Sequence, residues 1–150
     1  MTGFNHIATG AVIALAVKQP AIALPLAFVS HFVLDGLPHY GVPMDRRHEY
    51  ASLKRMLVID AVCSGLLVVA MILLTRSWLV VGCMLAAFSP DSVWGFKLAY
   101  DKLNGRRYSL PRDVFSRFHK KIQWGERPLG WVIELVCATA LVWALNSLVV

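Results

Sequence analysis

The chain has 150 residues, of which 57% are hydrophobic and only 16% are charged, and its mean hydropathy is +0.59. Soluble domains average about 25% charged residues, so this composition argues against an ordinary soluble domain and favours a helical membrane protein. The length fits a single transmembrane domain over residues 1–150. The net charge of +6 comes from basic residues in short loops between apolar segments, so we expect no nucleic-acid partner.

Five apolar segments follow one another along the chain: Phe4–Val17, Ala21–His39, Arg55–Thr75, Trp78–Phe96 and Leu129–Val150. A membrane span needs about 20 residues, and the last three segments reach that length. The first segment is shorter, so the first two segments either span singly or form a short hairpin. The sequence therefore predicts an all-α polytopic membrane protein with about five apolar helices.

The basic residues are distributed unequally between the connecting loops. Thirteen of the 15 Lys and Arg residues fall in the stretches 40–55 and 97–127, and only Lys18 and Arg76 fall on the other side. Loops that face the cytoplasm carry such an excess of positive charge. We therefore expect the N-terminus in the cytoplasm.

The polar stretch 101–127 contains one amphipathic pattern. Pro111 is typical of a helix start, and Val114, Phe115, Phe118 and Ile122 share one face. This pattern predicts a helix that lies in the cytoplasmic interface of the membrane. A solvated basic connector is the alternative.

The second apolar segment carries His31, Asp35 and His39 at four-residue intervals. Residues at this spacing share one face of a helix, and all three are metal-ligand types. We predict that they bind a divalent metal, zinc or manganese. Gly36 and Pro38 can end the helix before His39 joins this face.

Each remaining apolar segment places an ionisable residue near the same predicted membrane side; these residues are His6, Asp60, Asp91 and Glu134. An isolated charge at a helix centre costs about 3 kcal/mol on insertion scales. We therefore predict that these residues converge on one polar pocket. His6 is a further metal ligand, and Asp91, Asp60 or Glu134 completes the site or acts as the general base. For Asp60 and Glu134, an interhelical hydrogen bond is the alternative role. We expect His48 and His119 to be exposed to solvent.

Basic residues beside this pocket are candidates for binding a substrate phosphate, and we name Arg46, Arg47 and Arg127 for this role. A metal-bound water is a good nucleophile toward a phosphoester. The sequence therefore predicts hydrolysis of a phosphate- or ester-bearing, lipid-like substrate that enters from the bilayer.

Two short motifs resemble those of a known family. Asn5–Gly10 contains an early His-x-x-x-Gly, and Ser30–Pro43 contains Ser-His-x-x-x-Asp followed by a Gly-Val-Pro turn. In these features the chain resembles the small bacterial membrane-bound metal-dependent hydrolases. The resemblance covers about the first 45 residues. It implies a multi-span protein of the bacterial inner membrane with His6, His31 and Asp35 as metal ligands.

Two other functions are compatible with the same residues. A cation- or proton-coupled transporter or channel subunit would use the same His, Asp and Glu cluster. A non-enzymatic membrane scaffold would use the basic loops and the amphipathic helix to recruit anionic lipid or a partner.

Overall fold

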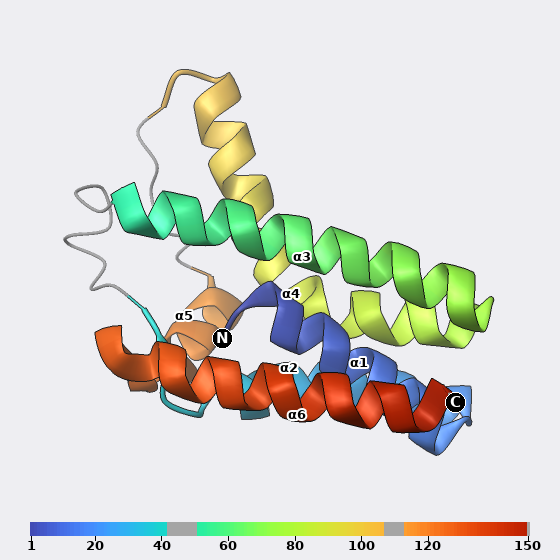
Figure 1. Cartoon of the computed structure of the whole chain (residues 1–150). Helices are drawn as coiled ribbons and strands as arrows, with labels where there is room; N and C mark the ends of the chain where they lie inside the picture. Colours follow the sequence, from blue (N-terminus) through green and yellow to red (C-terminus); the bar gives the residue numbers. More distant parts are fainter. Residues whose placement is uncertain (42–50, 107–112, 150) are drawn as a thin grey trace.

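The computed structural model describes residues 1–41, 51–106 and 113–149, and these residues form an all-α fold (Figure 1). The helices are α1 (Gly3–Val17), α2 (Pro20–Asp35), α3 (Ala51–Thr75), α4 (Trp78–Leu103), α5 (Val114–Ile122) and α6 (Trp131–Val149). Two short 3-10 helices, η2 (Gln123–Gly125) and η3 (Pro128–Gly130), lead into α6. The all-α prediction is confirmed.

Within the described residues, two helical stretches are long and apolar enough to cross a membrane: Arg55–Thr75 and Pro128–Val149. A third candidate is α4, which bends by 46° between Trp78–Val93 and Gly95–Asp101. Pro90 lies inside α4, about one turn before this bend, and cannot donate a backbone hydrogen bond to the helix. Helices α1 and α2 have 15 and 16 residues, which is less than the length of a perpendicular span.

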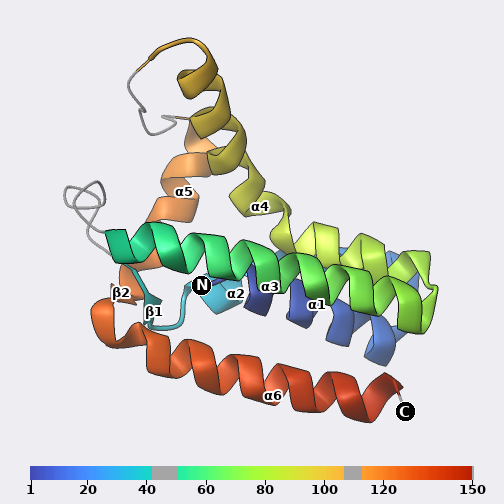
Figure 2. The same ribbon diagram turned by 45° about the horizontal axis from the view of Figure 1, so that its top comes forward.

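Helix α1 lies at the centre of the fold and contacts α2, α3, α4 and α6, with α3 and α6 on opposite sides of it (Figures 1 and 2). The buried face of α1 consists largely of small residues, including Ala8, Gly10 and Ala11. A Cβ atom on Gly10 would lie 2.4 Å from the carbonyl oxygen of Cys83 in α4. Small side chains therefore allow the backbones of α1 and α4 to approach closely, as is common between membrane helices.

Helix α2 ends at Asp35, and the chain then turns through Gly36 into a short strand, β1 (His39–Tyr40). This strand pairs in parallel with β2 (Glu126–Arg127), with His39 opposite Glu126. The predicted apolar segment Ala21–His39 is therefore shorter as a helix, because the chain leaves helical geometry before Pro38. The strand pair holds the end of α2 beside the start of α6, close to the N-terminus (Figure 2).

Candidate metal centre

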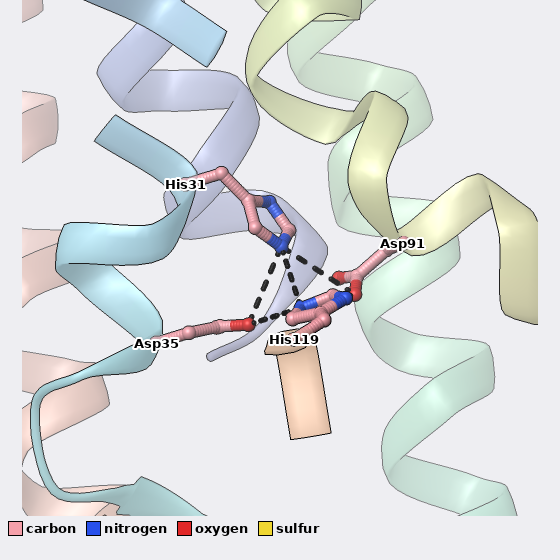
Figure 3. A group of neighbouring side chains, drawn as sticks. All are labelled: His31, Asp35, Asp91 and His119. Carbon is pink, nitrogen blue, oxygen red and sulfur yellow. Dashed lines mark hydrogen bonds and ion pairs between the residues drawn. The ribbon is translucent and has the colours of Figure 1, made fainter. Parts of the chain in front are cut away.

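Four metal-ligand side chains from three helices converge on one point: His31 and Asp35 from α2, Asp91 from α4 and His119 from α5 (Figure 3). One ligand atom from each residue lies within 4.8 Å of the other three. His31 and Asp35 are one helical turn apart, so the predicted face of α2 supplies half of the group. The other two members come from distant parts of the chain.

The spacing of these atoms fits one metal ion. His31 Nε2 lies 3.0 Å from His119 Nε2 and 3.3 Å from Asp35 Oδ2. Asp91 Oδ1 lies 3.7 Å from each of the two histidine nitrogens. Ligands about 2.0–2.1 Å from a tetrahedral zinc ion are about 3.3 Å from one another. The group can therefore hold a metal ion with small shifts of its side chains.

The orientation of His31 favours this use. Its Nδ1 lies 2.8 Å from the carbonyl oxygen of Ala87 in α4. Because a carbonyl only accepts hydrogen bonds, Nδ1 must carry the proton, and the neutral ring then presents a bare Nε2 to the centre of the group. A hydrogen bond from the second ring nitrogen to a carbonyl is the usual way in which a metal-binding histidine is oriented.

Burial differs among the members of the group. The side chains of His31, Asp35 and His119 are 0% exposed, whereas the side chain of Asp91 is 25% exposed. A buried carboxylate is costly unless it is paired or binds a metal. Water or a substrate can therefore reach the group from the side on which Asp91 lies.

His6 from α1 lies against this group without belonging to it. Its ring stacks on the ring of His31, with 3.9 Å between centroids. His6 Nε2 lies 3.1 Å from Asp35 Oδ1 and 4.0 Å from Asp91 Oδ2. The N-terminal ammonium of Met1 forms an ion pair with the same oxygen of Asp35 at 2.5 Å. His6 therefore faces the carboxylate oxygens that point away from His31 and His119.

His119 is a site residue that sequence reasoning missed, since its side chain is 0% exposed and not open to solvent as expected. Helix α5 begins after Asp113, whose carboxylate accepts a hydrogen bond from the Ser116 backbone N–H at 2.9 Å. The Ser116 hydroxyl also donates to Asp113 at 2.7 Å, and these two hydrogen bonds, that of the hydroxyl first, keep the pKa of Asp113 below the usual range of an aspartate. The aromatic rings of Phe115 and His119 both pack around Phe32 of α2.

The sequence contained one signal for the role of His119, which is its position on the amphipathic helix. His119 follows Phe115 by four residues, so it lies on the apolar face of α5 and not on the basic face. One turn later Gln123 Nε2 donates to Asp35 Oδ2 at 3.1 Å. The predicted amphipathic helix is present over Val114–Ile122. It has the expected apolar face, and it also contributes His119 to the candidate metal centre.

Asp60 and Glu134 lie away from the four-residue group and bind backbone N–H groups. Asp60 accepts hydrogen bonds from the N–H groups of Gly3 and Phe4 at 2.8 and 2.9 Å. Glu134 accepts one from Thr2 at 3.1 Å and one from Tyr40 at 3.2 Å. Both carboxylates therefore hold the start of α1, the helix that carries His6.

The other predicted site residues are not brought to the group. His39 is buried in β1, and its Nδ1 is 2.8 Å from the carbonyl oxygen of Leu37. Arg127 is exposed in β2. Arg46, Arg47 and His48 lie outside the described residues.

A cavity of about 650 Å³ adjoins the group on the side of Asp91 and Gln123. Its polar lining includes the carboxylates of Asp60, Asp91 and Glu134, and its apolar lining comes from α1, α3 and α4 and includes Ile7, Val68, Leu85 and Phe88. The stretch of α3 that lines it, from Met56 to Val68, is about 18 Å long. The cavity thus combines polar and apolar side chains beside the candidate metal centre.

Comparison with known proteins does not assign this chain to a family: no protein-family model matches it, and no curated protein or solved structure matches it. The resemblance to membrane-bound metal-dependent hydrolases therefore remains a prediction from its two short motifs.

Proposed function

We propose that this protein is a metal-dependent hydrolase of the bacterial inner membrane that acts on a phosphate- or ester-bearing, lipid-like substrate at the cytoplasmic face. The observation that carries the proposal is the convergence of His31, Asp35, Asp91 and His119 beside a cavity with an apolar wall. Two histidines and two carboxylates are a common donor set for zinc and manganese.

In the proposed reaction, water adds across an ester bond. The water oxygen forms the new bond to phosphorus or to the acyl carbon, the ester oxygen leaves, and that oxygen takes up a proton to give an alcohol. A divalent cation held by His31, Asp35, Asp91 and His119 would lower the pKa of a bound water and polarise the substrate oxygen. Asp91 is the partly exposed carboxylate of the group, so a substrate that enters from the cavity would reach the group beside it.

The shape of the cavity supports a substrate with an apolar chain. Asp91 and Gln123 line it next to the candidate metal ligands, and residues of α3 line it as far as Val68. An amphiphile would therefore place its scissile bond beside Asp91 and its chain between α1, α3 and α4. The long apolar helices, the positive charge of the loops and the motif resemblance support the membrane location and the cytoplasmic N-terminus.

The experiment that tests the proposal compares two histidines of the group with one histidine outside it. We expect the purified protein to contain a divalent metal by elemental analysis and to lose it in His31→Ala and His119→Ala. His39→Ala is the matched control, because His39 is buried but lies outside the group, and it should keep the metal.

Activity is then measured on vesicles that contain a phosphoester lipid, with release of the alcohol or phosphate product as the readout. Hydrolysis that requires metal and is abolished by Asp91→Asn supports the proposal. A purified protein without metal, or a metal-loaded protein that moves cations across liposomes and hydrolyses nothing, would refute it in favour of transport.

A further inference from the structure

The carboxylates of Asp35 and Asp91 each have one oxygen that the four-residue group does not use. Asp35 Oδ2 and Asp91 Oδ1 face His31 and His119, as Figure 3 shows for the two side chains that approach from α2 and α4. Asp35 Oδ1 and Asp91 Oδ2 face His6 Nε2 at 3.1 and 4.0 Å. The group therefore continues into a second set of ligand atoms on the side of α1.

We propose that His6, Asp35 and Asp91 bind a second metal ion, so that the protein holds a dinuclear centre in which both aspartates bridge. This inference rests on the proposed function and adds the nuclearity of its metal centre. Two ligands of one ion at about 2.1 Å can be at most about 4.2 Å apart, and both distances from His6 Nε2 are within that limit. Dinuclear hydrolytic centres hold their ions about 3.5–4 Å apart.

The position of His6 supports a ligand role. The ring is completely buried, and its Nε2 faces the two carboxylates. Its Nδ1 has no hydrogen-bond partner within the described part of the chain, so His6 differs from His31, whose Nδ1 is held by a carbonyl oxygen. Stacking on His31 fixes the ring at 3.9 Å, so His6 is held in place without a metal.

The N-terminal ammonium of Met1 already lies beside the proposed second position, 2.5 Å from Asp35 Oδ1. Both groups are completely buried, so this ammonium neutralises one carboxylate charge of the group. A second metal ion bound by His6 would take the place of the ammonium beside Asp35.

The dinuclear proposal is tested by metal stoichiometry and by the magnetic coupling of manganese. The protein is depleted with a chelator, titrated with Mn²⁺, and examined by elemental analysis and electron paramagnetic resonance. We expect two ions per chain and a spin-coupled spectrum in the parent protein. His6→Phe keeps a ring that can stack on His31 but has no ligand atom, so it should bind one uncoupled ion.

His39→Ala is the control and should keep two coupled ions, and His6→Ala repeats the test in case the larger Phe ring disturbs packing. A parent protein that saturates at one ion per chain, or His6 variants that still bind two, would overturn the second site and leave the proposed hydrolase intact. A parent protein that binds no metal would overturn both, so the two failures are distinguishable.

Discussion

Gly10→Ala gives the most quantitative prediction, because the space at this position is defined by backbone atoms. The added Cβ would lie 2.4 Å from the carbonyl oxygen of Cys83 and 2.9 Å from the Cα of Met84. Ordinary contacts begin near 3.4 Å, so α1 and α4 must separate by about 1.0 Å, the difference between 3.4 and 2.4 Å. Backbone atoms cannot rotate away as a side chain can, and overpacking of this kind costs about 1–3 kcal/mol.

The same substitution should weaken metal binding. Gly10 lies one turn after His6, and Cys83 lies two turns before Asp91. Separating α1 from α4 therefore moves His6 away from Asp91. We therefore expect Gly10→Ala to lower both the free energy of unfolding and the occupancy of the metal centre. This effect also explains the early His-x-x-x-Gly motif physically: the histidine faces the site, and the glycine permits the close approach that keeps it there.

Gly65→Ala is the matched control for Gly10→Ala. Nothing lies within 4 Å of a Cβ at Gly65, and alanine is favoured over glycine inside a helix by about 1 kcal/mol. Reversible unfolding in mixed micelles should thus show Gly10→Ala as less stable than the parent and Gly65→Ala as equal or more stable. If Gly10→Ala unfolds at or above the parent midpoint with its metal content unchanged, the close approach of α1 and α4 is not as described.

Three further predictions concern the cavity, the α5 cap and the start of α1. Gly65→Trp should fill the apolar part of the cavity and lower hydrolysis of a long-chain phosphoester at least fivefold, with metal content unchanged. Leu66→Trp, on the exposed face of α3, should leave hydrolysis unchanged. Equal activities of the two variants would show that the substrate does not use the cavity. The pKa of Asp113 lies below the usual aspartate range, so its carboxylate stabilises α5 at pH values above that usual range. This stabilisation is lost as the pH falls through the lowered pKa of Asp113. Hydrogen exchange at the Ser116 amide should thus speed up in Asp113→Ala but not in Asp113→Asn, which caps equally well; similar rates in all three proteins would exclude the cap. Asp60→Asn should retain metal but lower thermal stability, because Gly3 and Phe4 donate to different oxygens of Asp60 and the NH2 group of asparagine cannot accept the second hydrogen bond. Complete loss of metal would instead place Asp60 in the metal centre.

Much of the local organisation could be predicted because it depends on periodicity and hydropathy. The apolar segments correspond to helices, and the four-residue spacing of His31 and Asp35 puts both on the face that carries the site. The ending of α2 at Asp35 follows from Gly36 and Pro38, which separate His39 from that face. Such features depend on neighbours within one or two turns, which the sequence displays directly.

The membership of the metal centre depended on contacts between distant segments. His119 and Asp35 are 84 residues apart, and a hydrogen bond of 2.8 Å joins them only because α5 packs against Phe32 of α2. Charge pattern alone could not distinguish Asp91, which reaches the site, from Asp60 and Glu134, which bind the N-terminal backbone. The three carboxylates lie on α3, α4 and α6, and the rotation of each helix about its axis decides which groups its carboxylate contacts.

The helical class, the apolar segments and the His31–Asp35 pair could be predicted, since hydropathy and the 3.6-residue repeat act over a few neighbouring residues. Helix packing was needed to show that Asp91 and His119 complete a metal-binding group, that His6 faces the opposite oxygens of its aspartates, and that a cavity adjoins it. These relations depend on how closely α1, α2, α4 and α5 approach one another, which small residues such as Gly10 permit and which no local pattern encodes.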